Sequence, residues 1–193
     1  MKTNLQITET LAAFASETEL SWLAEQKALT GKALALAFVK TPRFITKKTI
    51  EGDRFTNWTL DQLARLDLLM QLDPANIDSL FETAEMHEAV TLTQALPYLP
   101  NPSTYLLRAT DAVRSNMGPV FDAIAFGNPY PQTYFSELAW NQLVLKCIFN
   151  DKPIHLIEGL DERANQALAN TLADFAHERW AAGRRVPSQV WRL

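Results

Sequence analysis

The sequence predicts an all-α protein made of stacked antiparallel helices. Apolar residues recur at helical spacing along most of the chain, and strict alternation of apolar and polar residues, which would indicate strands, is confined to short pieces near 35–39 and 154–157. Gly31, Gly127 and Gly183 each follow a segment with this helical period, where a left-handed residue commonly ends a helix. Together these observations predict a chain that is almost entirely helical.

The predicted helices follow one another with short turns. Pro74 comes directly after Asp73, which is the usual pairing of an N-cap with the first helical residue. In chain order the helices are expected at residues 4–15, 17–30, 32–40, 59–72, 74–83, 85–96, 102–116, 118–126, 132–149 and 163–182. The one long segment without helical period is KTPRFITKKTIEGDRFTNW, residues 40–58, which we expect to be a basic surface loop or an insertion.

The length of the chain favours one domain. At 193 residues and 21.8 kDa it can bury one core, and no change in composition marks a boundary, so residues 1–193 are expected to form a single helical domain. Residues 80–127 resemble stacked helix pairs of HEAT-like length, although no period repeats faithfully. A HEAT-like helical repeat and an irregular helical bundle therefore both remain open, and we favour the stack.

Charge and cysteine content exclude several classes of protein. The net charge is −4 and the sequence pI is near 5.4, so there is no basic field to hold nucleic acid or an anionic membrane. The single cysteine, Cys147, excludes a disulfide framework. The N-terminal segment has no long apolar stretch behind basic residues, so we expect neither a signal peptide nor an integral membrane segment. The expected location is cytoplasmic.

The sequence contains no complete motif for catalysis, metal binding or cofactor binding. His87, His155 and His177 lie far apart and outside any HExxH pattern, and Cys147 stands in an apolar helical run where an inert buried thiol is expected. A GxSxG elbow, a glycine-rich phosphate loop and a dinucleotide fingerprint are all missing. We therefore expect no metal and no cofactor, leave the catalytic residues unknown, and favour a protein that is not an enzyme.

The string AWNQLVLK places two amides in the middle of an apolar helix. On a helical wheel Asn141 projects between Leu145 and Ile148, inside the apolar arc, whereas Gln142 falls nearer an edge. A buried amide without partners costs about 1–3 kcal/mol. Asn141 must therefore bond to a neighbouring backbone, another side chain or a ligand, and we favour an Asn that ties a loop or a helix end.

Several other polar and aromatic residues of the second half stand in apolar settings, and together with the two amides they form a candidate ligand-binding cluster. In such a site an arginine would pair with a carboxylate or phosphate, a histidine would be the one plausible proton shuttle, and the aromatic rings would stack on an aromatic ligand. Each residue also has an ordinary structural explanation, such as a cap, a turn or a tie to a helix end. The candidates are Arg114, Asn116, Asn128, Tyr130, Trp140, Asn141, Gln142, His177, Arg179 and Trp180.

The C-terminal half resembles the EboA family. The resemblance rests on RSNM, VFDAIA, NPYP, AWNQLVLK, GLDERAN, AHERWAAGR and the terminal WR, and it is looser in the first half, through LALAFVKTPRF and ALPYLP. It implies a place in a bacterial and cyanobacterial gene cluster for making or exporting a secondary metabolite. In cyanobacteria that cluster is associated with moving the precursor of the pigment scytonemin toward the periplasm. No catalytic residue is transferred by the resemblance.

Two functional hypotheses follow. The first is a non-catalytic helical scaffold or adaptor, whose partners would be other proteins of the same gene cluster or a metabolite intermediate. The alternative is a small-molecule-binding protein or metal-free enzyme, with a pocket formed by the candidate cluster of the second half. Neither hypothesis involves nucleic acid.

Overall fold

The structure, a computed structural model, describes residues 2–52 and 55–193 and confirms the all-α prediction. In this part of the chain there are α-helices and 3-10 turns but no strands, and one isolated antiparallel bridge joins Thr49 to Thr59. The chain divides into two compact units, which we call unit 1 (Met1–Pro102) and unit 2 (Ser103–Leu193). The expectations of a single domain and of a HEAT-like repeat stay predictions.

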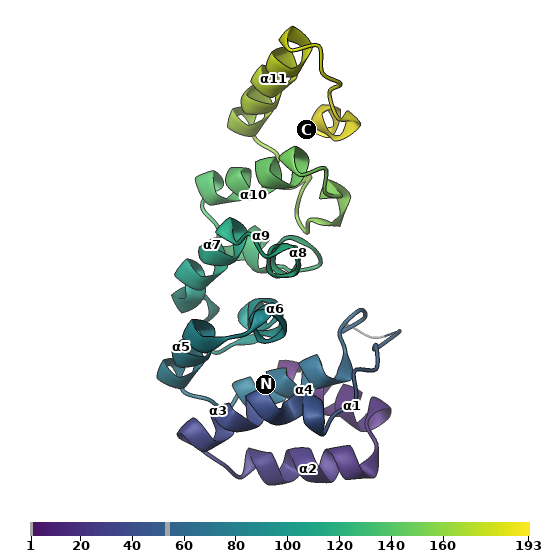
Figure 1. Cartoon of the computed structure of the whole chain (residues 1–193), viewed down its shortest axis with the longest axis vertical. Helices are drawn as coiled ribbons and strands as arrows, with labels where there is room; N and C mark the ends of the chain where they lie inside the picture. The colour runs from purple at the N-terminus through teal and green to yellow at the C-terminus, as the bar shows by residue number, and fades with distance from the viewer. Residues whose placement is uncertain (1, 53–54) are drawn as a thin grey trace. The chain divides into compact units, whose positions relative to one another are not determined.

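Unit 1 contains six α-helices and their connecting turns (Figure 1). They are α1 (Lys2–Phe14), α2 (Glu17–Lys27), α3 (Gly31–Lys40), η1 (Thr41–Arg43), α4 (Leu60–Leu69), α5 (Pro74–Thr83), α6 (Met86–Ala95) and η2 (Leu96–Tyr98). Helix α4 packs against α1, α2, α3 and α6, and all of its residues except Gln62 are buried. It is therefore the centre of the core of unit 1.

Local sequence explains most helix ends in unit 1. Asp73 caps α5, because its Oδ1 accepts a hydrogen bond from the backbone N–H of Asn76 at 3.0 Å, with Pro74 as the first helical residue. Gly31 has a φ of +53°, but it opens α3, and α2 has already ended at Lys27. The prediction that Gly31 ends a helix was therefore off by one short turn.

The segment 40–58, expected as a surface loop, contributes to the core of unit 1. Residues 53 and 54 lie outside the described residues, but Ile50 and Phe55 on either side are fully buried. The backbone N–H of Ile50 donates to the carbonyl of Trp58 at 2.8 Å, so the described parts fold back on each other. The rings of Trp58 and Tyr98 pack against Phe55, with centroids 5.6 and 5.7 Å away.

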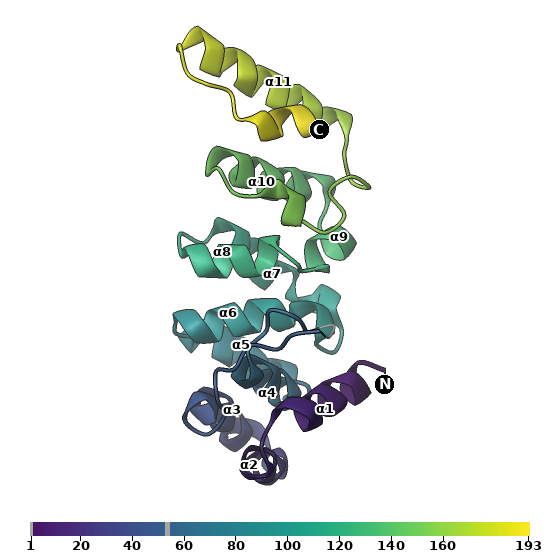
Figure 2. The ribbon, with the colours of Figure 1, turned by 90° about the vertical axis from the view of Figure 1, so that its right-hand side faces the viewer.

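Unit 2 contains the other five α-helices. They and their 3-10 turns are η3 (Pro102–Tyr105, which begins at the last residue of unit 1), α7 (Leu106–Arg114), α8 (Gly118–Ala125), α9 (Tyr130–Tyr134), α10 (Glu137–Phe149), η4 (Ile154–Leu156), α11 (Gln166–Ala181) and η5 (Ser188–Arg192). Helix α9 packs on α7 and α8, α10 packs on α11, and η5 returns along α11, as Figure 2 shows.

The helix predicted over 132–149 is two helices. Ser136 interrupts it, because its hydroxyl accepts a hydrogen bond from the backbone N–H of Ala139 and so begins α10 as an N-cap. Gly127 and Gly183 behave as predicted: each adopts a positive φ, +58° and +65°, two residues after the end of α8 and of α11.

Candidate functional site

A groove lies in unit 2 between the end of α10, the end of α11 and the C-terminal segment, and we call it the C-terminal groove. Its volume is about 380 Å³, and it is lined by Ile148, Phe149, Asp151, Arg179, Arg185, Pro187, Ser188 and Gln189. A second hollow of about 420 Å³, lined by Asp151, Pro153, Ile154, His155, Ser188, Gln189 and Arg192, adjoins it and shares three of these residues. Asp151, Ser188 and Gln189 are the residues that line both hollows.

The C-terminal segment forms a wall of the groove because α11 ends in a glycine turn. The backbone N–H of Gly183 donates to the carbonyl of Trp180 at 2.9 Å, and that of Arg184 donates to the carbonyl of Arg179 at 2.8 Å. These bonds satisfy carbonyl groups of the last turn while the chain reverses. Pro187 then precedes the turn η5, which brings residues 188–192 back beside α11.

Two side-chain contacts and one buried side chain hold this wall in place. The side-chain oxygen of Gln189 accepts a hydrogen bond from the backbone N–H of Ile154 at 3.0 Å. Arg192 pairs with Asp161 at 3.2 Å, and Val190 is buried. Gln189 and Arg192 therefore anchor the wall to the segment between α10 and α11, and Val190 adds a buried apolar side chain.

Arg179 lies at the rim of the groove, where a backbone carbonyl and an aromatic ring hold its guanidinium. Its Nε donates to the carbonyl of Arg185 at 2.6 Å, and its guanidinium lies over the ring of Phe175, 5.5 Å from the centroid. The Phe175 ring in turn packs on Phe149, with centroids 4.7 Å apart. Among the described residues, neither the terminal nitrogens of Arg179 nor the guanidinium of Arg185 has a hydrogen-bond or ion-pair partner.

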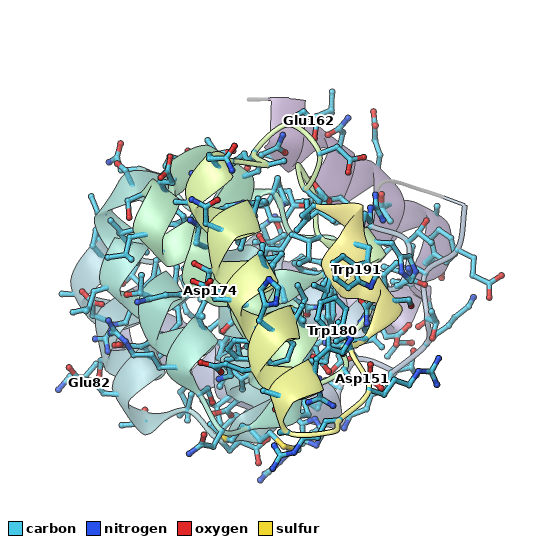
Figure 3. All side chains as sticks on the ribbon, turned by 90° about the horizontal axis from the view of Figure 1, so that it is seen from above. Glu82, Asp151, Glu162, Asp174, Trp180 and Trp191 are labelled. Atoms are coloured by element: carbon cyan, nitrogen blue, oxygen red, sulfur yellow. The ribbon has the colours of Figure 1, made fainter. Side chains whose placement is uncertain are left out.

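An exposed aromatic cluster stands on α11 and η5. The rings of Trp180 and Trp191 stack at 25° with centroids 5.6 Å apart, and they lie side by side in Figure 3. His177 packs edge-on against Trp180, also at 5.6 Å. Both tryptophans are more than half exposed, 55% and 59%. Large aromatic surfaces of this kind are usual where another molecule binds.

Asn141 is a structural tie at the start of α11. Its amide exchanges two hydrogen bonds with the amide of Asn165, at 2.8 and 3.2 Å. Asn165 is the N-cap of α11, because its Oδ1 also accepts a hydrogen bond from the backbone N–H of Leu168 at 2.9 Å. The preferred sequence interpretation, an Asn that ties a helix end, therefore describes Asn141 well. Its neighbour Gln142 is exposed.

Arg163, which was not among the candidates from the sequence, binds backbone carbonyl groups around α9. One of its terminal nitrogens donates to the carbonyl of Pro131 at 2.8 Å and the other to that of Phe135 at 2.9 Å. Its guanidinium also lies over the Trp140 ring, 4.7 Å from the centroid. Trp140 is fully buried, so its ring is part of the core, and its Nε1 has no hydrogen-bond partner in the described structure.

Asn128 and Tyr130 build the turn between α8 and α9. The Asn128 amide donates to the carbonyl of Ala123 at 2.8 Å, and its oxygen accepts from the backbone N–H of Tyr130 at 3.0 Å. Both residues are buried. Burial, with a smaller contribution from Tyr134, raises the pKa of Tyr130 to about 12, so its phenol stays protonated at neutral pH.

Arg114 and Asn116 lie on the surface at the end of α7. Arg114 pairs with Asp111 at 3.2 Å, one turn earlier on the same helix, and Asn116 is exposed. The carbonyl groups at this helix end are satisfied by Lys146 of α10, whose Nζ donates to Val113 at 2.6 Å and to Ser115 at 2.8 Å. The cation that ties the C-terminus of α7 is therefore Lys146, and Arg114 does not do so.

The ten predicted site residues thus fall into three groups. Arg114, Asn116 and Gln142 are on the surface, whereas Asn128, Tyr130, Trp140 and Asn141 take part in internal packing and hydrogen bonding. His177, Arg179 and Trp180 share the last turns of α11, and of these Arg179 lines the C-terminal groove. Sequence reasoning missed Phe149, Arg185 and Gln189. The arginine-rich tail after Gly183 was a signal for Arg185 and its neighbour Gln189, but no signal was available for Phe149.

The described residues outside the groove include neither a reactive nucleophile at Cys147 nor a cluster of metal ligands. Burial raises the pKa of the Cys147 thiol to about 12, so it is not a nucleophile near neutral pH. The part of the chain that the structure describes contains no group of three or more His, Cys, Asp or Glu side chains able to hold a metal ion. It also contains no helix long and apolar enough to cross a membrane.

Comparison with known proteins identifies the family. A family model described as "Metabolite traffic protein EboA" matches residues 3–193, nearly the whole chain, including the first half where the sequence resemblance is looser. Searches among curated proteins and among solved structures gave no significant match. Since the family model covers both units, the chain belongs to the EboA family of metabolite traffic proteins.

Proposed function

We propose that this protein binds a small metabolite without transforming it, and that the C-terminal groove is the binding site. The description of the family as metabolite traffic proteins supports a role in handling a metabolite. The observation that carries the proposal is the groove itself, whose volume of about 380 Å³ lies in the range of small-molecule sites.

The lining of the groove suits a bound organic molecule. Ile148, Phe149 and Pro187 are the apolar residues of the lining, and Asp151, Arg179, Arg185, Ser188 and Gln189 are its polar and charged residues. Apolar surface combined with polar groups that can hydrogen-bond is typical of sites that fix the orientation of a ligand. A metal-free enzyme is less well supported, because His177, the candidate proton shuttle, packs on Trp180 and is not among the residues that line the groove.

Fluorescence titration with N-phenyl-1-naphthylamine, a neutral apolar probe, tests the proposal. Phe149 is 55% exposed and offers its ring to the groove, so Phe149→Ala removes apolar contact area and is expected to weaken probe binding about 5–10-fold. Leu138→Ala is the matched control, since Leu138 is an exposed apolar residue of the same helix that does not line the groove. Equal affinities for the wild type and both variants would contradict the proposal.

A second candidate function is that of an adaptor for other proteins of the gene cluster that the family resemblance implies. The observation that favours it is the exposed stack of Trp180 and Trp191, because tryptophan is enriched among residues that dominate protein interfaces. If the stack is a docking surface, Trp180→Ala with Trp191→Ala abolishes association with a purified cluster protein, whereas Leu138→Ala leaves it unchanged. The cytoplasmic location also stays a proposal.

A further inference from the structure

The C-terminal segment carries positive charge in an acidic protein. The chain has a net charge of −4, yet residues 184–193 contain Arg184, Arg185 and Arg192 and no acidic residue. Of these, Arg185 lines the C-terminal groove, where it joins Arg179 of α11. The two arginines of the groove therefore come from different segments, α11 and the C-terminal segment, which lie side by side because the chain reverses at Gly183.

The charges around the groove do not cancel. The C-terminal groove is lined by one acidic residue, Asp151, and by two basic residues, Arg179 and Arg185. The nearby cations Arg192 and Lys152 are already paired, with Asp161 and Asp122 respectively. The residues that line the C-terminal groove therefore have a formal net charge of +1. The two guanidinium groups, which have no ion-pair partner among the described residues, are the strongest hydrogen-bond donors of the groove.

The hydrogen bond from Arg179 Nε to the Arg185 carbonyl leaves both terminal nitrogens of Arg179 free for a ligand. The Phe175 ring beneath the guanidinium restrains its plane, which lowers the entropy lost when it binds an acceptor. Arg185 is exposed, and no ion pair holds its guanidinium among the described residues. One preorganised and one exposed arginine beside the apolar side chains of Ile148 and Phe149 match a molecule that is apolar at one end and anionic at the other.

We propose that the ligand of the C-terminal groove carries an oxyanion, a carboxylate or a phosphate, on an apolar body. The body lies against Ile148 and Phe149, and the oxyanion accepts hydrogen bonds from Arg179 and Arg185. This inference rests on the proposed function, because it names the chemical class of the molecule that the same groove binds.

Two fluorescent probes that differ by one charged group test this inference. 8-Anilinonaphthalene-1-sulfonate has the aromatic body of N-phenyl-1-naphthylamine and adds a sulfonate, so it is the anionic member of the pair. Arg185→Gln is expected to weaken the binding of the anionic probe about 5–10-fold, the loss typical of one charge-assisted hydrogen-bonding partner at a partly exposed site. The same variant is expected to change the affinity for the neutral probe by a smaller factor, because that probe has no anionic group for Arg185 to bind. Arg184→Gln is the matched control, because it removes the same charge from the neighbouring exposed residue, which does not line the groove.

The possible results separate this inference from the proposed function. If Arg185→Gln leaves the anionic probe unaffected while Phe149→Ala still weakens both probes, the groove binds molecules but the oxyanion class is wrong. If Arg184→Gln and Arg185→Gln weaken the anionic probe equally, the attraction comes from overall charge and the inference is overturned. If Phe149→Ala affects neither probe, the proposed function itself fails.

Displacement of the anionic probe identifies the oxyanion. Octanoate and octyl phosphate present a carboxylate and a phosphate on the same apolar chain, and octan-1-ol presents neither. Displacement by either anion at concentrations where octan-1-ol has no effect supports the inference, and the anion that acts at the lower concentration identifies the preferred group. Equal displacement by all three compounds overturns it.

Discussion

The two units of the molecule use charged side chains in opposite ways. Nine of the ten buried polar or charged residues in the described chain belong to unit 1, and Asn128 is the exception in unit 2. The nine are Thr10, Glu19, Thr41, Asp61, Arg65, Asp67, Glu88, Thr91 and Thr93. In unit 2, by contrast, Arg179 and Arg185 remain unpaired at a groove, and Trp180 and Trp191 are exposed. Unit 1 thus buries charged side chains in its core, whereas the two guanidinium groups at the groove of unit 2 have no ion-pair partner among the described residues.

Arg65 shows how unit 1 holds a charge in its core. Only 2% of its side chain is exposed, its Nε donates to the carbonyl of Phe38 at 3.0 Å, and its guanidinium lies over the Phe38 ring. One terminal nitrogen is 3.8 Å from the carboxylate of Glu88. Burial lowers the pKa of Arg65, and the carboxylates of Asp61 and Glu88 oppose that shift, so the guanidinium is retained by its neighbours.

The largest effect is expected for Arg65→Met. This change leaves the buried carboxylates of Asp61 and Glu88 without their cation, and breaking a buried pair in this way costs about 3–5 kcal/mol. Urea denaturation measures the free energy of unfolding. The matched variant is Arg114→Met, which removes an exposed pair with Asp111 and is expected to cost at most about 0.5 kcal/mol. If both variants lost the same free energy of unfolding, the buried charge of unit 1 would matter no more for stability than the exposed pair of unit 2.

A pH-dependent loss of stability is the next largest effect, and it arises at Glu19. Burial alone would raise the pKa of Glu19, but hydrogen bonds from Ser16 and from the backbone N–H of Thr46 outweigh it and lower the pKa from 4.5 to about 2. The carboxylate therefore stabilises the folded state fully above pH 4.5, and this contribution disappears as the pH falls toward 2. The contribution amounts to about 3 kcal/mol at most.

Glu19→Gln isolates this contribution from that of the other acidic groups. We expect the wild type to be more stable than the variant near pH 6, with the difference shrinking steadily between pH 4.5 and pH 2 in urea denaturation. A difference that stays constant over this interval would show that the Glu19 carboxylate titrates at its ordinary pKa.

A smaller effect is expected in unit 2 for Asn141→Leu. The change removes both amide bonds to Asn165 and so weakens the cap of α11, at a cost of about 1–2 kcal/mol. Gln142→Leu, at the exposed neighbouring position, is expected to change stability by less than about 0.5 kcal/mol. If Asn141→Leu leaves stability unchanged but abolishes binding of the anionic probe, Asn141 belongs to a ligand site, and its role as a structural tie is wrong.

Local signals predicted much of the fold. The helical period, the Asp73–Pro74 pair and the glycines at 127 and 183 act over a few residues, so they place helices and their ends from sequence alone. The break before α10 was also readable, because Ser136 followed by Glu137 is a common helix start. It was obscured by the apolar residues that continue through Tyr134 and Phe135.

The candidate site was harder to predict because its residues meet through tertiary contacts. The helical wheel correctly separated Asn141 from the exposed Gln142, but it does not reveal Asn165, which lies 24 residues away. Arg179 was one of the candidate binding residues, and the structure puts it at the rim of a groove. Arg185 lies in a segment without helical period, so no wheel predicts its direction. Its place in the groove depends on the chain reversal at Gly183 and on the hydrogen bond between Gln189 and Ile154.

Hydrogen–deuterium exchange with and without saturating 8-anilinonaphthalene-1-sulfonate tests most directly whether the C-terminal groove binds a small molecule. The peptides that contain residues 148–151 and 179–190 hold the lining of the groove, so their amide exchange is expected to slow when the probe binds. Peptides of unit 1, including those of α4, are expected to exchange at unchanged rates. Protection centred on unit 1 or on residues 128–141, or no protection at all, would contradict the assignment of the C-terminal groove as the binding site.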